Sequence, residues 1–385
     1  MKSKVLIISD FIWSHYRAKL LSEIFKKLPK NLDCFAIYIA ENERSRTALG
    51  NVDYTIHLYP YKILFKKTFE DVSSFKKIIN ILNEIIKFKP NVIIIPGWVD
   101  LYCWFVLFYA KLFKIKVIVE SDVTEFCRKR NPFKELLKRF FLKLCSGGLS
   151  KGIKSANYLE KLGMKRCNIF ISHFTPDNNF IAERRLEFFN KKEEKKISYG
   201  FKRYNMLFVG RFSLEKNIET LIYSFYNIKN LTEKALEWGL ILVGDGHQKK
   251  HIEELVHKLG LNGSIFFIGG KSWNEVYEFY ALADVFVLPS ISEPWGIVVN
   301  EAMICELPIV ISNRAGTTEL VKEGENGFTF DPYSIDELTN ILLKFINKEV
   351  NLKLMGKKSK EIINNFTPES SAENMLKGIL KVLPK

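Results

Sequence analysis

Two glutamates eight residues apart mark the part of the chain best suited to holding a charged ligand. Glu293 and Glu301 lie in the run 292–303, which follows a short apolar stretch. Pro294 suits the first turn of a helix, so we expect Glu293 at the helix mouth and Glu301 about two turns inside, roughly 12 Å further along the axis. Amide groups near Gly296 would lie between the two carboxylates, at the positive end of the helix dipole. This order fits a ligand with a sugar, a diphosphate and a ribose; the alternative is a capped helix with Glu301 as a surface acid.

Two basic residues follow a second apolar stretch, 206–209. Arg211 sits in the turn GRFSLEK (210–216), and Lys216 opens the next predicted helix. An arginine and a lysine can converge on a diphosphate and neutralise the charge that develops as a leaving group departs. Solvation of two basic side chains in a loop is the simpler alternative.

Glycine-containing turns follow three more apolar stretches. The turn at Gly316 leads into a predicted helix, whose mouth can accept an anion. Gly269 and Lys271 can flank a nucleobase through backbone contacts. The sequence GDG at 244–246 is instead typical of a tight turn.

These motifs depend on the elements that carry them. Short apolar runs alternate with longer amphipathic segments, which is the pattern of parallel strands and covering helices. Ligands of such sheets bind beyond the carboxyl ends of the strands, where the motifs above fall. The predicted strands are 5–9, 33–39, 92–96 and 117–120 in the first half, and 206–209, 240–243, 264–268, 285–288 and 309–312 in the second.

Both halves are therefore predicted to be doubly wound α/β domains. The charged run KKEEKK at 191–196 is typical of a solvated loop and marks the junction. We expect an amino-terminal domain at 1–190, a linker at 191–203 and a carboxy-terminal domain at 204–367. A terminal helix is expected within 368–385.

Three motifs together, Glu-x7-Glu at 293–301, Gly-Arg-x4-Lys at 210–216 and YALADVFVLPS at 280–290, resemble the retaining glycosyltransferases of family 4, the glycosyl transferases group 1. The resemblance is specific from about 204 to 330. It implies a GT-B fold, in which two Rossmann-like domains face each other across a cleft and the helix at 368–385 packs back on the amino-terminal domain. In that case the amino-terminal domain binds the acceptor and the carboxy-terminal domain binds the nucleotide sugar.

The resemblance also implies an activity. A hexosyl group would move from a UDP- or GDP-sugar to a saccharide or lipid-linked acceptor, with retention of configuration and without a metal or other cofactor. Cell-surface polysaccharide or glycolipid synthesis is the expected setting. A nucleotide-sugar-binding relative without transferase activity and a nucleotide-sugar epimerase of the same fold are the alternatives.

Site roles follow residue by residue. Arg211 and Lys216 would bind the donor diphosphate, Glu301 the ribose hydroxyls and Glu293 the transferred sugar. Many members have a histidine and an aspartate after the strand 117–120, whereas this chain has Glu120-Ser121-Asp122. The catalytic candidates are Glu293, Arg211, Lys216, Asp122 and Glu120, and the donor-binding candidates are Glu301, Trp295, Gly296, Ile297, Gly210, Gly316, Gly269 and Lys271.

The acceptor side has weaker candidates, all located just after predicted strands. His15 and Arg17 follow the first strand, and Gly97 and Trp98 follow the strand 92–96. An aromatic face such as that of Trp98 can stack on a sugar. A further departure from the family is Glu306, where a glycine is usual; a left-handed backbone there would cost glutamate about 1 kcal/mol.

The charge of the chain is concentrated in its first half. Residues 1–200 carry 37 Lys and Arg against 20 Asp and Glu, whereas the whole chain has a net charge of +15. A basic half favours an anionic membrane surface or a lipid-linked acceptor as neighbour, and no nucleic-acid motif is present. The six scattered cysteines support neither a disulfide framework nor a zinc site. We expect a cytoplasmic protein, at the inner face of the membrane when it is bound there.

Overall fold

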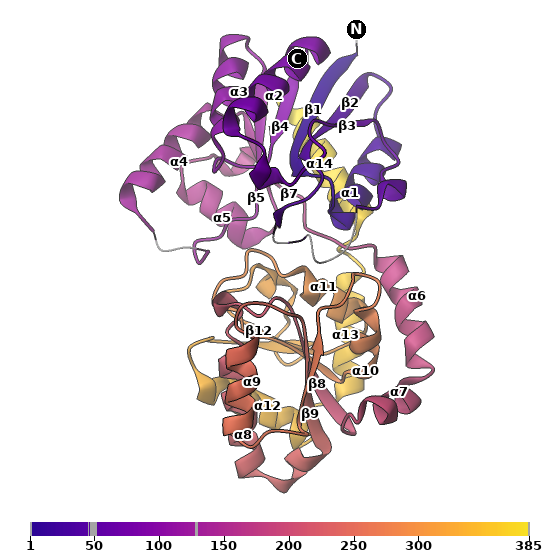
Figure 1. The fold of residues 1–385 in the computed structure, drawn as a ribbon. Helices are drawn as coiled ribbons and strands as arrows, with labels where there is room; N and C mark the ends of the chain where they lie inside the picture. Colours follow the sequence, from indigo (N-terminus) through magenta and orange to yellow (C-terminus); the bar gives the residue numbers. More distant parts are fainter. Residues whose placement is uncertain (1, 45, 47–51, 128–129, 384–385) are drawn as a thin grey trace. The chain divides into compact units, whose positions relative to one another are not determined.

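The computed structural model describes residues 2–44, 46, 52–127 and 130–383. The chain forms two compact units, Met1–Thr175 with Pro368–Lys385 and Pro176–Thr367, each built on a parallel sheet (Figure 1). The α/β prediction is therefore confirmed for both halves. No helix among the described residues combines the length and the apolar character needed to cross a bilayer.

Unit 1 has a seven-stranded sheet with the order β3-β2-β1-β4-β5-β6-β7. All of its neighbouring strands run parallel, as in a doubly wound fold. The strands are β1 (Ser3–Phe11), β2 (Leu32–Ala40), β3 (Tyr61–Ile63), β4 (Val92–Ile95), β5 (Lys116–Ser121), β6 (Gly147–Ser150) and β7 (Ile169–Ile171).

Helices cover both faces of this sheet. The apolar faces of α2, α3, α4 and α5 form one core cluster with the sheet, and α1 and α14 form another on the opposite face (Figure 1). The terminal helix α14 thus belongs to unit 1, where it packs against α1 and β7. The helices of unit 1 are α1 (His15–Lys26), α2 (Ser74–Phe88), α3 (Leu101–Leu112), α4 (Pro132–Leu144), α5 (Ile153–Lys161) and α14 (Pro368–Val382).

Unit 2 has a six-stranded parallel sheet with the order β10-β9-β8-β11-β12-β13. Its strands are β8 (Tyr204–Val209), β9 (Trp238–Val243), β10 (Ile265–Gly269), β11 (Val285–Leu288), β12 (Ile309–Ser312) and β13 (Gly327–Phe330). Its helices are α6 (Asn178–Phe189), α7 (Lys192–Tyr199), α8 (Ile218–Leu231), α9 (Lys249–Lys258), α10 (Tyr277–Leu282), α11 (Ile297–Ile304), α12 (Ile335–Ile346) and α13 (Leu352–Ile363).

The expected linker at 191–203 is wrong, because most of that segment is the helix α7 of unit 2. Two lysines of the charged run are tied to the unit: Lys192 pairs with Asp284 at 3.0 Å, and Lys196 pairs with the same carboxylate at 3.2 Å. Lys196 is only 4% exposed. The boundary therefore falls near Thr175 rather than Asn190, and the run belongs to unit 2 through the ion pairs of these two lysines.

Candidate functional site

The first candidate site lies in unit 2, in the loops that follow β8, β11 and β12. The side chains of Lys216 and Glu293, which are 77 residues apart in sequence, form a hydrogen-bonded ion pair. Ser290 also reaches the Glu293 carboxylate, at 3.4 Å. Glu293 is 8% exposed, so its charge is held by these neighbours and not by bulk water. Two of the predicted catalytic residues are thus brought together.

The loop that carries Glu293 is fixed by its backbone. Glu293 forms an isolated bridge with Ala315, and its carbonyl accepts the amide of Gly316 at 3.0 Å. A Cβ atom at Gly316 would lie 2.0 Å from the carbonyl oxygen of Pro294. Position 316 therefore requires glycine, because any side chain would push the two loops apart.

The helix α11 begins later than expected. It starts at Ile297, and its N-cap Gly296 has a left-handed backbone with φ 95°. Pro294 and Trp295 therefore precede the helix, and Glu301 lies about one turn inside it instead of two. The prediction failed because a turn at Gly296 interrupts the segment, which allows the Glu293 side chain to pack beside it.

Glu301 is 4% exposed and accepts a hydrogen bond from the hydroxyl of Tyr280 at 2.8 Å. Trp295 is also buried, and its indole nitrogen donates to Asn300 at 3.0 Å. The backbone from Trp295 to Ile297 is held at the mouth of α11 by this packing. Tyr280 was not among the residues we predicted, although it lies in the motif 280–290.

Arg211, in contrast, is exposed, and its side chain forms no hydrogen bond or ion pair within the described part of the chain; only its backbone carbonyl accepts a hydrogen bond, from the amide of Ser213 at 3.0 Å. The GDG turn packs directly against the loop that carries Arg211. A Cβ atom at Gly244 would lie 1.9 Å from the carbonyl oxygen of Gly210, so only glycine allows this close approach. Gly269 ends β10 and accepts the amide of Gly244 at 2.9 Å. Lys271 lies further along, with its ammonium 5.9 Å from the ring of Phe279. Arg211 is thus available to a ligand, whereas the glycines shape the loops.

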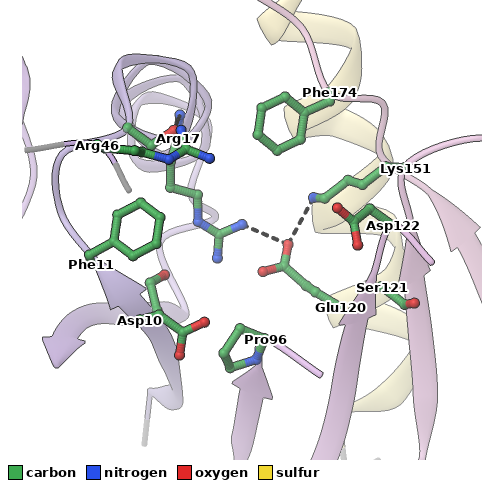
Figure 2. A pocket seen from close by; sticks show the side chains of 12 residues that line it. Asp10, Phe11, Arg17, Arg46, Pro96, Glu120, Ser121, Asp122, Lys151 and Phe174 are labelled. Carbon is green, nitrogen blue, oxygen red and sulfur yellow. Dashed lines mark hydrogen bonds and ion pairs between the residues drawn. The ribbon is translucent and has the colours of Figure 1, made fainter. Parts of the chain in front are cut away.

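The second candidate site is a pocket of about 260 Å³ at the carboxyl ends of the strands of unit 1 (Figure 2). Its polar residues come from loops that are far apart in sequence, as the topology of a doubly wound sheet requires. The residues that line it are Ser9, Asp10, Phe11, Ser14, Arg17, Arg46, Pro96, Glu120, Ser121, Asp122, Lys151 and Phe174.

Glu120 lies between two cations at the floor of this pocket. Arg17 contacts its Oε1 at 2.7 Å and Lys151 contacts the same atom at 3.0 Å (Figure 2). Burial raises the pKa of Glu120, but the charges and hydrogen bonds of Arg17 and Lys151 outweigh it and lower the pKa to about 2. A carboxylate with so low a pKa is a poor proton acceptor. Its geometry suits holding the two cations in place.

Asp10 behaves in the opposite way. Burial raises its pKa to about 6, although a hydrogen bond from Tyr102 at 2.6 Å acts against that rise. The Nε and Nη2 atoms of Arg17 are buried without a hydrogen-bond partner in the described structure. The pocket therefore has spare hydrogen-bond donors on Arg17 and a carboxyl group whose pKa is raised by burial to about 6.

The remaining acceptor-side candidates do not line the pocket. Trp98 is 7% exposed and belongs to the core of unit 1, so its face is not open to a sugar. Gly97 has φ 132° and lies beside Pro96, which does line the pocket. His15 is half-buried against Trp13, with ring centroids 5.6 Å apart, and burial lowers its pKa.

Sequence reasoning missed several lining residues. Asp10 lies at the carboxyl end of β1 and Lys151 directly follows β6, and that position is the signal by which they could have been found. The strand β6 escaped notice because its sequence is GGLS, which lacks the usual β-branched and aromatic residues. Arg46 comes from a long loop after β2, and no local pattern predicts its position.

Comparisons with known proteins bear on both units. Residues 190–365 match the family model described as Glycosyl transferases group 1. An uncharacterized glycosyltransferase of Methanocaldococcus jannaschii is 33% identical over 189 residues, which is 49% of this chain and 50% of that protein. The sulfoquinovosyl transferase of Arabidopsis thaliana is 30% identical over 182 residues, or 46% of this chain and 32% of that protein. The chain thus spans about half or less of the length of these relatives.

A solved structure of Anabaena HepE in complex with UDP and glucose superposes over 98% of this chain and 99% of its own, with a TM-score of 0.72 and 17% identity. The chain has the GT-B fold. The residues that match the Glycosyl transferases group 1 model, 190–365, coincide with nearly all of unit 2.

Proposed function

We propose that this protein is a retaining glycosyltransferase that moves a hexosyl group from a nucleotide-diphosphate sugar to an acceptor. The observation that carries the proposal is the convergence of Lys216 and Glu293 at the carboxyl edge of the sheet of unit 2, inside the glycosyl transferases group 1 domain. Relatives are named as a sulfoquinovosyl transferase, an alpha-D-kanosaminyltransferase and an N-acetyl-alpha-D-glucosaminyl L-malate synthase, which supports sugar transfer in general. HepE was solved with UDP, which supports a nucleotide-sugar donor.

In the proposed mechanism, Arg211 and Lys216 bind the donor diphosphate and stabilise the negative charge of the departing nucleotide. Glu293 contacts the transferred sugar, and Glu301 holds the ribose. The backbone at Trp295, Gly296 and Ile297 forms the wall of the diphosphate pocket. Two cationic side chains would supply the charge neutralisation that a divalent metal supplies elsewhere, so we expect transfer to continue in EDTA.

We further propose that the pocket of unit 1 receives the acceptor, a saccharide or a lipid-linked molecule. Arg17 and Lys151 favour an acceptor with a phosphate or carboxylate near the reacting hydroxyl, because charge-assisted hydrogen bonds to such groups are strong. Glu120 holds these two cations, and Asp122, exposed at the pocket edge, is the candidate to orient the hydroxyl group. Synthesis of a surface polysaccharide or glycolipid on the cytoplasmic face of a membrane would provide such acceptors.

The test begins with the donor. A thermal-shift screen against UDP-, GDP-, ADP-, CMP- and TDP-sugars should give one positive nucleotide, because a ligand of the folded state raises its melting temperature. Glu293→Gln and Lys216→Met should then lower transfer at least about a hundredfold while the fold is kept. Glu325→Gln and Lys322→Met, in the loop before β13, are the matched controls and should leave transfer unchanged. Unchanged turnover in both site variants would remove the proposal.

Two alternatives remain in the same assay. A nucleotide-sugar-binding protein without transferase activity would show a thermal shift but neither transfer nor donor hydrolysis. A nucleotide-sugar epimerase would convert the donor to free nucleotide and sugar, or to its epimer, without an acceptor. The buried pair Lys216–Glu293 favours a catalytic site over a binding scaffold, which does not need a carboxylate held in this position. The need for an acceptor then separates a transferase from an epimerase.

A further inference from the structure

The outward face of α3 in unit 1 is apolar, although the inward face already fills the core. Leu101, Phe105, Phe108 and Leu112 follow one another at helical spacing and are 46% to 77% exposed. The core side of the same helix is occupied by other residues, such as the fully buried Val106. A helix that is apolar on both faces is typical of a helix buried on both sides, so the outward face of α3 is expected to contact a second apolar environment.

The neighbouring helix α4 repeats this pattern. Phe133, Leu136, Leu137 and Phe140 are spaced i, i+3, i+4 and i+7 and are 42% to 68% exposed. Leu142, on the opposite side, is buried in the core with Phe141. Both helices therefore present a row of large apolar side chains to the outside of unit 1.

The two rows form one surface. The ring of Trp104 on α3 lies 6.1 Å from that of Phe108 and stacks on Phe140 of α4 at 6.5 Å. In Figure 1, α3 and α4 lie on the same side of unit 1. We define the α3–α4 face by its nine exposed members, which are Leu101, Phe105, Phe108, Leu112, Phe113, Phe133, Leu136, Leu137 and Phe140.

The charges around this face indicate what covers it. Residues 101–116 and 132–144, which carry α3 and α4, contain seven Lys and Arg against one acid. That acid, Glu135, pairs with Lys138 at 2.7 Å. Lys134, Arg139 and Lys143 lie exposed between the apolar residues of α4. A second copy of this chain would bring a like-charged face against this one, whereas anionic lipid headgroups complement it.

We propose that the α3–α4 face is an interfacial membrane-binding surface, with its leucines and phenylalanines inserted among the acyl chains and its lysines and arginines on anionic headgroups. Apolar side chains next to a basic face are the combination by which peripheral helices bind the bilayer interface. Membrane binding by this face is a function separate from sugar transfer, and the two are related only if the acceptor is lipid-linked. Binding to vesicles needs neither donor nor acceptor, so failure of one proposal leaves the other standing.

The experiment is co-sedimentation of the full-length protein with phosphatidylcholine vesicles, with and without phosphatidylglycerol. Wild type should bind only the anionic vesicles. The triple variant Leu112→Ser, Phe133→Ser, Leu136→Ser should bind at least about tenfold more weakly, because the inserted apolar area is lost. Its matched control is Leu231→Ser, Leu236→Ser, Leu354→Ser, whose leucines in unit 2 are 62% to 65% exposed and should not contribute. Circular dichroism checks that every variant is folded.

A charge variant tests the second half of the proposal. Lys134→Glu, Arg139→Glu, Lys143→Glu should lower binding by about tenfold or more, and added salt should lower wild-type binding toward the same level. Lys234→Glu, Lys250→Glu, Lys353→Glu, which are exposed in unit 2, carry the same change in net charge. Equal loss in both charge variants would show that only net charge matters and would overturn the assignment to this face.

Insertion has its own readout. In a Leu136→Trp variant, the added fluorescence should be quenched by vesicles with brominated acyl chains, and an absence of quenching overturns insertion. Failure of wild type to bind anionic vesicles, or binding of the serine variant equal to that of its control, also overturns the proposal. If wild type is a dimer in solution and the serine variant a monomer, the face is an interface between copies instead.

Discussion

The buried carboxylate Glu120 allows the energetics of the unit 1 pocket to be tested directly. Replacement by glutamine keeps the shape but leaves the charges of Arg17 and Lys151 without their counterion. The pKa of Glu120 is lowered from 4.5 to about 2. At 1.36 kcal/mol for each pKa unit, the ionised form stabilises the folded state by about 3 kcal/mol at neutral pH. We expect Glu120→Gln to lower the free energy of unfolding of unit 1 by about that amount at pH 7.

The pH dependence has a defined sign. Because the folded pKa is depressed, the contribution of Glu120 is fully present above pH 4.5 and is lost as the pH falls toward 2. Asp10 supplies the opposite control: its pKa is raised from 3.8 to about 6, so the wild type loses stability as the pH rises from about 4 through 6. Asp10→Asn should therefore become more stable than wild type, by up to about 3 kcal/mol, over that interval.

The assay is urea-dependent hydrogen exchange of peptides that cover β4 and β5, which reports the unfolding of unit 1 separately from unit 2. Each variant is compared with wild type at the same pH, from 3 to 8. A difference between wild type and Glu120→Gln that stays below about 1 kcal/mol at pH 7, or that does not shrink below pH 4.5, would refute the argument. In that case the three side chains would be hydrated in solution rather than locked together.

Two further variants test unit 2. Gly316→Ala should weaken nucleotide-sugar binding at least about tenfold and cost about 1–3 kcal/mol of stability, because its Cβ would lie 2.0 Å from the Pro294 carbonyl. The control is Gly270→Ala, whose Cβ would have its nearest neighbour 3.8 Å away. Its Kd for the nucleotide sugar, measured by isothermal titration calorimetry, should be unchanged. Tyr280→Phe removes a hydrogen bond to Glu301 and should raise the Kd for the nucleotide several-fold with little change in kcat, whereas Tyr277→Phe, its buried neighbour, should not. Equal effects from a variant and its control would point to general loss of packing.

The sequence predictions succeeded where a structural feature depends on neighbouring residues and failed where it depends on residues distant in the sequence. Each of the nine predicted strands has a counterpart among the strands of the structure, because a buried parallel strand needs only a short apolar run. The strand β6 was missed because Gly147 and Gly148 carry no apolar side chain; neighbouring atoms would lie about 3 Å from their Cβ positions. Such closeness is a property of packing and cannot be seen in a local pattern.

Local patterns also gave a wrong prediction where contacts with residues distant in the sequence determine the structure. The run KKEEKK indicated a solvated loop, yet Asp284 recruits Lys192 and Lys196 and makes the segment a packed helix. Glu306, by contrast, has φ 60°, the left-handed backbone considered from the sequence. Arg185 contacts its carboxylate at 3.1 Å and the preceding carbonyl at 2.9 Å, which offsets part of the backbone cost.

The sequence by itself determined that the chain forms parallel α/β domains and that its acids, cations and glycines follow the carboxyl ends of strands. Only the tertiary structure decided which of them meet. Arg17 and Glu120 are 103 residues apart, and Lys216 and Glu293 are 77 apart. Strand order in the two sheets brings these loops together. Burial then raises the pKa of Asp10, whereas the neighbouring cations Arg17 and Lys151 lower the pKa of Glu120. The physical reason is that periodicity fixes the direction of a side chain within its own element, whereas partners and solvent exposure depend on how the elements pack.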